Sequence, residues 1–220
     1  MILTETHLHT KEVSPCGSVS AKEIPSLYKE KCYGNIIVTD HFKEDYLEQL
    51  SSNKNKALDL WLKGYRIARE EGEKIGVNVF LGMEINLNES KNEYLIYGIT
   101  QDFVLQSDGI FDLKINELYK LVKENGCLIY QAHPFRNYCS PQKCEYLDGI
   151  EVYNGNMRHD SHNDKALDYA VANNMKILSG SDFHEYEDLA HGGIYLPEYV
   201  KTNFELVKYL STNVPEFKKS

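Results

Sequence analysis

Short apolar runs alternate with longer amphipathic segments along most of this chain. Residues 36–38 are apolar and β-branched throughout, which is typical of a buried parallel strand. Within residues 54–75, Leu58, Trp61 and Leu62 recur at helical spacing. The pattern predicts strands at 1–10, 35–39, 77–84, 94–99, 127–132, 150–155 and 175–181.

Helical segments are predicted between most of these strands. Residues 20–23, Ser-Ala-Lys-Glu, have the form of a capping box, and they predict a helix over 24–31 that Gly34 closes. Gly64 weakens a long helix predicted over 54–75. Further helices are predicted from Ile115 to an Asn125-Gly126 stop, over 165–174 and over 204–210, and a polar tail follows the last one.

Strands that alternate with helices predict an α/β fold with a parallel sheet. Seven strands with polar residues at their carboxyl ends indicate a closed or nearly closed β/α barrel, in which the chemistry lies at that end. An open doubly wound sheet is the alternative. No repeat, linker or low-complexity tract divides residues 1–220, so we expect a single domain.

Composition restricts the classes of function. The five cysteines are an odd number without a Cys-x-x-Cys pair, which favours reduced thiols in a cytoplasmic protein. Cys139 and Cys144 are a weaker candidate zinc pair. We expect no membrane segment and no signal peptide. The net charge of −9 argues against a broad basic surface for nucleic acid.

Metal-ligand residue types stand at the ends of the predicted strands. His7 and His9 are separated by one residue, so both point the same way from a strand end. One barrel mouth would bring the whole set together: His7, His9, Asp40, His41, Glu84, His133, Asp182 and His184.

This order of motifs resembles the PHP (polymerase and histidinol phosphatase) family. The resemblance runs from about residue 1 to 196, and it implies a distorted seven-stranded barrel that holds up to three metal ions. Five motifs carry it: His7-Leu8-His9, Thr39-Asp40-His41, Gly82-Met83-Glu84, Ala132-His133-Pro134 and Ser181-Asp182-Phe183-His184.

The resemblance also implies ligand sets. His7, His9, Glu84 and Asp182 would hold one metal. Glu84 would bridge to a second metal shared with His133, and His41 and His184 would hold a third. Two positions depart from the family pattern, since Glu12 is the best candidate in the loop after His9, and Glu93 stands where the family has a histidine.

Other polar residues receive supporting roles. Asp40, Glu151 and Glu5 are candidates to orient ligand imidazoles through hydrogen bonds. His191 is a candidate for the same orienting role or for a place in the substrate pocket. Arg136, Arg158 and His159 are candidates to bind substrate, with Lys11 as a weaker one. Cys16 is given a packing role in its loop rather than that of a nucleophile.

The implied reaction is hydrolysis of a phosphate ester by a hydroxide that bridges two metals, because bound water has a pKa near ~7 instead of ~16. The expected substrate is a small phosphomonoester, as for a histidinol phosphatase. The alternatives are a nucleotide phosphatase or 3′–5′ exonuclease, and a non-catalytic metal-binding barrel. Mixed His and carboxylate ligands suit zinc, manganese and iron alike, and the oligomeric state stays open.

Overall fold

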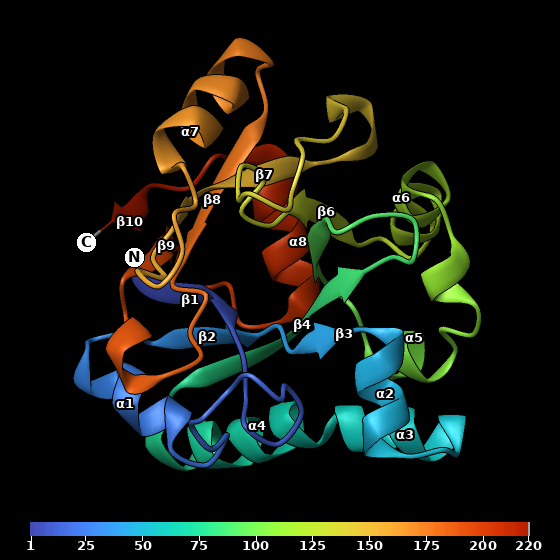
Figure 1. Ribbon diagram of the computed structural model, residues 1–220. Coiled ribbons are helices and arrows are strands. Elements are labelled where there is room, and N and C mark those ends of the chain that lie inside the picture. Colours follow the sequence, from blue (N-terminus) through green and yellow to red (C-terminus); the bar gives the residue numbers. More distant parts are fainter. Residues whose placement is uncertain (220) are drawn as a thin grey trace.

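The computed structural model describes residues 1–219 as one strongly curved mixed sheet with most helices on its outside (Figure 1). All seven predicted strands are present: β1 (Ile2–Leu8), β2 (Asn35–Val38), β4 (Asn78–Asn86), β5 (Glu93–Tyr97), β6 (Leu128–Gln131), β7 (Gly149–Asn154) and β8 (Lys176–Gly180).

Three further strands were not predicted, so a count of seven does not describe the sheet. β3 (His41–Phe42) is too short to show a period, and β9 (Gly192–Leu196) begins with two glycines. β10 (Phe217–Lys219) lies in the segment predicted as a polar tail. It joins the sheet through backbone pairing with β9, which its lysines do not signal.

The strand order is β10-β9-β1-β2-β4-β5-β6-β7-β8, with β3 beside β4. β5 runs antiparallel to both β4 and β6, so the predicted parallel sheet is wrong at this strand. The sheet nearly closes between its β1 and β8 sides. The backbone N–H of His9 donates to Phe183 O at 2.9 Å, and that of Phe183 donates to His7 O at 3.1 Å. A nearly closed, distorted barrel therefore describes the fold better than an open doubly wound sheet.

The helices are α1 (Ile24–Glu30), α2 (Glu44–Leu50), α3 (Lys54–Trp61), α4 (Lys63–Ile75), α5 (Gln101–Leu105), α6 (Ile115–Glu124), α7 (Asn163–Ala172) and α8 (Asn203–Thr212). Three 3-10 turns, η1 (Ile110–Asp112), η2 (Cys144–Tyr146) and η3 (Tyr186–Asp188), complete the described elements. Within residues 1–219, no helix is both long enough and apolar enough to cross a bilayer.

Two local predictions about helices need correction. The predicted helix over 54–75 is two helices, α3 and α4, that meet at Leu62. A Cβ on Gly64 would clash with Thr10 Oγ1 and Asp40 Oδ2, so the start of α4 packs directly on these polar groups. The predicted capping box at 20–23 does not form, because Glu23 is the N-cap of α1 without a side-chain hydrogen bond.

An apolar cluster fills one end of the barrel interior. α8 covers this end, where Gly98, directly after β5, has a φ of 93° and leaves room for Val207. Since β5 is antiparallel, this is the end at which β4 and β6 begin. The cluster comprises Ile37, Phe80, Leu95, Tyr97, Leu128, Tyr130, Ala132, Leu178, Ile194, Leu196, Val200, Leu206 and Leu210.

Candidate metal centre

Buried ligand-type side chains meet at the opposite end of the barrel. Four groups of three offer ligand atoms that all lie within 4.8 Å of one another. The groups are His7, Glu84 and His133; His7, His9 and Asp182; His41, Glu84 and Glu93; and His9, His41 and His184. The structure thus brings together eight of the nine predicted ligands.

The first site lies at the end of β1. Nε2 of His7 is 3.2 Å from Glu84 Oε1 and 3.3 Å from Asp182 Oδ1. Nε2 of His9 is also 3.3 Å from Asp182 Oδ1. Gly180 makes room for this arrangement, because a Cβ there would lie 2.5 Å from that of His7.

Hydrogen bonds fix which nitrogen each imidazole presents. Nδ1 of His7 donates to Glu151 Oε1 at 2.9 Å, and Nδ1 of His184 donates to the carbonyl of Asp182 at 2.8 Å. A carboxylate and a carbonyl only accept, so both Nδ1 atoms carry the proton. In the neutral imidazole each Nε2 then presents a lone pair to the centre, as a metal ligand does.

Several buried atoms of this centre have no hydrogen-bond partner among the described residues. They include Nε2 of His7, Nε2 of His9, Nδ1 of His41 and Oε2 of Glu84. Nδ1 of His41 lies 2.6 Å from Glu84 Oε2 without hydrogen-bond geometry. Buried polar atoms without partners are rare and costly. Lone pairs that converge from several sides fit a divalent cation.

The second site depends on the direction of β5. Glu93 is the first residue of β5, and because this strand is antiparallel it reaches the end at which its neighbours finish. Its Oε2 lies 3.4 Å from His133 Nε2, which is also 3.2 Å from Glu84 Oε1. Glu84 belongs to two of the groups, as expected of a bridging carboxylate.

The third site is a stack of imidazoles. The ring of His9 lies 4.1 Å from that of His41 and 4.2 Å from that of His184, between centroids. Burial and these two neighbouring imidazoles lower the pKa of His9 well below its ordinary value. A neutral imidazole is the form that binds metal.

The other charges of the centre balance one another. Burial alone would raise the pKa of Glu84, but His41 and His7 hold it well below its ordinary value. Burial alone would lower the pKa of His7, but Asp182 and Glu151 raise it well above. Glu84 is therefore an anion at neutral pH, which suits a ligand for a cation.

Two candidate ligands stand on unusual backbone. His133 has a φ of 28° and Asp182 a φ of 50°, a region that residues other than glycine seldom adopt. Such strain persists where the surroundings demand it, often at functional sites. Each position lies two residues after a strand, β6 or β8, and both side chains are buried in the cluster.

Polar groups behind the ligands hold them in place. Glu151 Oε2 accepts from the backbone N–H of His133 at 3.0 Å, so this carboxylate supports two ligands. Asp40 accepts from Thr10 N at 2.6 Å and from Ser14 Oγ at 2.8 Å. Burial raises the pKa of Asp40 to about 7, although these hydrogen bonds oppose the shift.

Three predicted residues lie outside the cluster. Glu12 accepts from Ser20 Oγ and from the N–H of Ala21, and it belongs to none of the groups found among residues 1–219. His191 donates to the carbonyl of Gly155 rather than to a ligand. Glu5 accepts from Tyr28, from Ser181 and, at 2.9 Å, from the backbone N–H of His7, so it contacts a candidate ligand through its backbone rather than through its imidazole.

A cleft of about 160 Å³ opens above the ligands. Arg136, Arg158 and His159, which are the predicted substrate-binding residues, line it, whereas Lys11 is exposed and not part of the lining. Four further lining residues were not predicted for the cleft: Cys16, Lys43, Tyr138 and Asn156. The basic side chain of Lys43 and the aromatic side chain of Tyr138 are the types of residue by which the sequence could have indicated them. The full lining is Cys16, His41, Lys43, Glu93, His133, Arg136, Tyr138, Asn156, Arg158, His159, Asp182 and His184.

The cations of the cleft are held by acidic partners. Arg136 Nη2 lies 2.6 Å from Asp182 Oδ2, and Lys43 Nζ lies 2.5 Å from Glu93 Oε1. Both acids are also candidate metal ligands, so each cation stands directly beside a metal position. Arg158 pairs with Asp188 at 2.9 Å.

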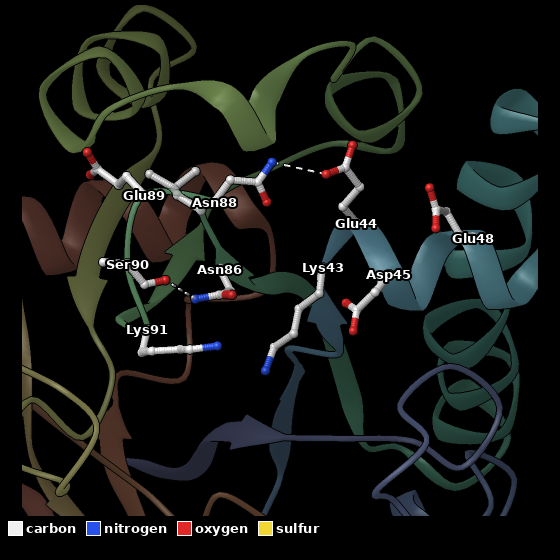
Figure 2. Close-up of a pocket in the computed structure, with 10 residues that line it drawn as sticks. Lys43, Glu44, Asp45, Glu48, Asn86, Asn88, Glu89, Ser90 and Lys91 are labelled. Atoms are coloured by element: carbon white, nitrogen blue, oxygen red, sulfur yellow. Dashed lines mark hydrogen bonds between the residues drawn. The ribbon is translucent and has the colours of Figure 1, made fainter.

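A larger pocket of about 510 Å³ adjoins the cleft, and Lys43 lines both. Figure 2 shows Lys43 extending away from Glu44 and Glu48, which project from α2. This pocket is mixed in charge but rich in carboxylates. Its lining is Lys43, Glu44, Asp45, Glu48, Asn86, Leu87, Asn88, Glu89, Ser90 and Lys91.

No protein-family model matches the chain. The uncharacterised protein MJ0417 of Methanocaldococcus jannaschii is 30% identical over 143 residues, which cover 60% of this chain. The match spans about half of that relative's length, 49%.

Solved structures resemble the chain over nearly its full length. PsfC from Pseudomonas syringae superposes with a TM-score of 0.73 and 15% identity, covering 100% of this chain and 91% of PsfC. A two-domain protein from Bacteroides vulgatus, described as containing a predicted PHP-like metal-dependent phosphoesterase, gives 0.66 and 16%, over 99% and 64% of the two chains. The lesion-specific endonuclease EndoQ from Pyrococcus furiosus gives 0.68 and 18%, over 98% and 57%. At these identities the likeness establishes the fold.

Proposed function

This chain has the fold of PHP-like metal-dependent phosphoesterases, and from that premise we propose that it hydrolyses a small phosphomonoester with the help of bound divalent metals. One observation carries the proposal: buried imidazole and carboxylate atoms without hydrogen-bond partners converge beneath a cleft that cations line. A non-catalytic barrel would have little use for a cationic cleft directly above its metals.

The ligands divide into three positions that share residues. His7, His9 and Asp182 would hold one metal with Glu84. Glu84 would bridge to a second metal, held with Glu93 and His133, and the imidazoles of His9, His41 and His184 face a third position. When bound, such metals supply an activated water and neutralise charge on the phosphoryl oxygens.

The chain's own residues would bind and orient the phosphate. Arg136 is 5% exposed and lines the cleft, and its planar guanidinium, whose Nη2 donates to Asn154 and Asp182, would turn donors toward a bound phosphate. Lys43 lies between β3 and α2, and its partner Glu93 would act as a ligand of a bound metal. Once Glu93 bound the metal, the ammonium of Lys43 would lose this partner and could donate to an oxygen of the phosphoryl group.

The leaving group is expected to be small or cationic rather than a nucleic-acid strand. The cleft of about 160 Å³ accommodates a phosphoryl group, and the adjoining pocket presents the carboxylates of Glu44, Asp45, Glu48 and Glu89. These carboxylates would repel the phosphates of a strand that continued in this direction. Phosphodiester cleavage remains the second candidate because the endonuclease EndoQ shares the fold.

A substrate panel tests the proposal. The purified chain is stripped of metal, reloaded with Mn²⁺ or Zn²⁺, and assayed on phosphomonoesters with neutral, anionic and aminated leaving groups and on oligonucleotides. We expect turnover of phosphomonoesters that depends on added metal. Turnover confined to oligonucleotides, with a steep salt dependence, would favour the second candidate. Metal binding without hydrolysis of any substrate would leave the non-catalytic barrel.

A double variant ties the activity to the centre. His7→Ala combined with His9→Ala should abolish turnover and remove bound metal while the barrel stays folded. His162→Asn is the matched control, because His162 lies outside the cluster and has a φ of 47°, which asparagine tolerates. Retained turnover in the double variant would exclude this mechanism.

A further inference from the structure

We propose that the thiolate of Cys16 is a ligand of the third metal, beside the imidazoles of His41 and His184, at the place where Glu12 was expected to contribute a carboxylate. This inference rests on the proposed function, since it assigns one more ligand to the same centre. It makes the third position a mixed nitrogen and sulfur site.

Both carboxylate oxygens of Glu12 accept hydrogen bonds outside the cluster. Its Oε1 accepts from Ser20 Oγ at 3.0 Å and its Oε2 accepts from the N–H of Ala21 at 2.8 Å, so both oxygens hold the segment that leads into α1. To reach the cluster, Glu12 would have to give up both hydrogen bonds. The loop after β1 therefore needs another residue if it is to supply a ligand.

Backbone contacts place Cys16 between the two histidines. On one side of it, Ser14 Oγ accepts from the N–H of His41 at 3.1 Å. On the other side, the N–H of Ser18 donates to the carbonyl of His184 at 2.8 Å. The loop is thus tied to the backbones of both ligands, two residues before Cys16 and two residues after it.

Cys16 shares the cleft with the cluster. Cys16 lines the cleft together with His41 and His184, although its Sγ is not within 4.8 Å of all the ligand atoms in any of the groups found among residues 1–219. The other cysteines near the barrel mouth are placed differently. Cys16 and Cys144 are both exposed, but Cys144 is not part of the cleft lining, and Cys139 lies 3.9 Å from Nδ1 of His133.

A separate observation indicates that a ligand is missing here. Nε2 of His9 and Nδ1 of His41 are buried without hydrogen-bond partners among the described residues, and the side chains of both histidines are at least nine-tenths buried. His9, His41 and His184 bring their ligand atoms within 4.8 Å of one another. His9 already serves the first position, so the neutral imidazoles of His41 and His184 would need a further ligand at the third, and a thiolate would supply both that ligand and an anion for a dication.

The chemistry of the donor set has a consequence for metal choice. Thiolate ligands favour zinc and iron over manganese and magnesium, and zinc commonly takes four nitrogen and sulfur ligands. Binding would replace the thiol proton by the metal and release that proton to solvent. The third position should therefore discriminate between metals more strongly than the first two, which carboxylates complete.

Cobalt substitution tests the assignment without an activity assay. The metal-free full-length chain, kept reduced, is titrated with Co²⁺ while the near-ultraviolet thiolate-to-cobalt charge-transfer band is followed, and bound metal is counted after dialysis. We expect the band in the wild-type chain, its loss in Cys16→Ser with one equivalent fewer bound, and its retention in Cys144→Ser and Glu12→Gln. Cys16→His should restore the equivalent but not the band.

The outcomes separate the two proposals. A wild-type chain that binds Co²⁺ through His7 and His9 but shows no charge-transfer band would overturn the role of Cys16 and leave the proposed function standing. A band that survives in Cys16→Ser would overturn it as well. A chain that binds no metal at all would overturn both proposals. Loss of one bound metal in Glu12→Gln would mean that Glu12, and not Cys16, is the ligand supplied by the loop after β1.

Discussion

The two ends of the barrel interior are built from the same strands and have opposite chemistry. In β4, Phe80 packs in the apolar cluster while Glu84, four residues later, is a candidate bridging ligand. Leu178, in β8, and Asp182, two residues beyond the strand, repeat this spacing. An even number of residues keeps both side chains on one face, so a strand can carry packing at one end and ligands at the other.

The difference between the apolar end and the ligand end shows which of them stabilises the fold. The apolar end gains free energy from every buried contact, whereas the ligand end buries polar atoms that have no partners and therefore cost free energy. Changes at the ligand end should act mainly on metal and turnover, and changes at the apolar end mainly on the free energy of unfolding.

Glu84→Gln should have the largest effect. Glu84 belongs to two ligand groups, so its loss as an anion affects two metal positions at once. We expect turnover to fall by at least about a thousandfold, equivalent to ~4 kcal/mol of transition-state stabilisation, with less bound metal. Steady-state kinetics and metal analysis measure both effects.

The control for this variant is Glu117→Gln, an exposed acid-to-amide change at the start of α6. It should keep full turnover. If Glu84→Gln retained metal and turnover while its unfolding midpoint fell sharply, Glu84 would be a structural residue and the contrast between the two ends would fail.

Leu206→Ala tests the apolar end. Leu206 is fully buried where α8 covers the barrel, so truncation leaves a cavity and should cost about 3 kcal/mol of unfolding free energy. Phe204→Ala, on the same helix but 76% exposed, should change it by less than about 0.5 kcal/mol. Urea denaturation measures both. Metal bound per folded molecule should not change in either variant, and a loss there would show that the two ends are coupled.

Much of the fold could be predicted because local signals agree with it. The seven predicted strands are apolar runs of the right length, and each is present. What failed depends on contacts between distant segments. The apolar residues of β5 do not determine whether the strand runs parallel or antiparallel to its neighbours. β10 pairs with β9 through backbone atoms, which are the same in every sequence. Gly64 is likewise explained only by its contact with Asp40 and Thr10, far away in the chain.

The candidate site divides in the same way. His7 and His9 stand at the end of β1 and Asp182 stands two residues after β8, so strand ends locate them. Glu93 reaches the cluster only because β5 is antiparallel. The position of Glu12 depends on a loop conformation that residues 10–20 alone do not reveal. Lys43 was overlooked because its role depends on the cleft rather than on a motif.

Glu151→Gln tests the difference between the two ends through a residue that holds the candidate ligands His7 and His133 by hydrogen bonds. Glu151 accepts from His7 Nδ1, from His133 N and from Asn154 Nδ2, and an amide cannot accept from all three in the same orientation. We expect zinc affinity to fall by about 10- to 100-fold, measured by competition with a chelator.

Glu205→Gln is the matched change at the other end of the barrel. Glu205 also accepts several hydrogen bonds, from Lys201 N, Thr202 N and Thr202 Oγ1 at the start of α8. It should lower stability slightly and leave zinc affinity unchanged. Equal effects of the two variants on zinc affinity would mean that the affinity follows stability rather than the orientation of His7.

Asp40→Asn should have the smallest effect, and it depends on pH. Burial raises the pKa of Asp40 to about 7, above the usual value of a carboxyl in an unfolded chain. The folded protein therefore holds this proton more tightly, which stabilises it at low pH, and the contribution is lost as the pH rises from about 4 through 7. Asparagine has no such proton. In metal-free protein, the unfolding free energy of the variant should gain about 1 to 2 kcal/mol relative to wild type between pH 5 and pH 7. Denaturation curves at both pH values check this, and a constant difference would mean that Asp40 stays ionised beneath the ligands throughout.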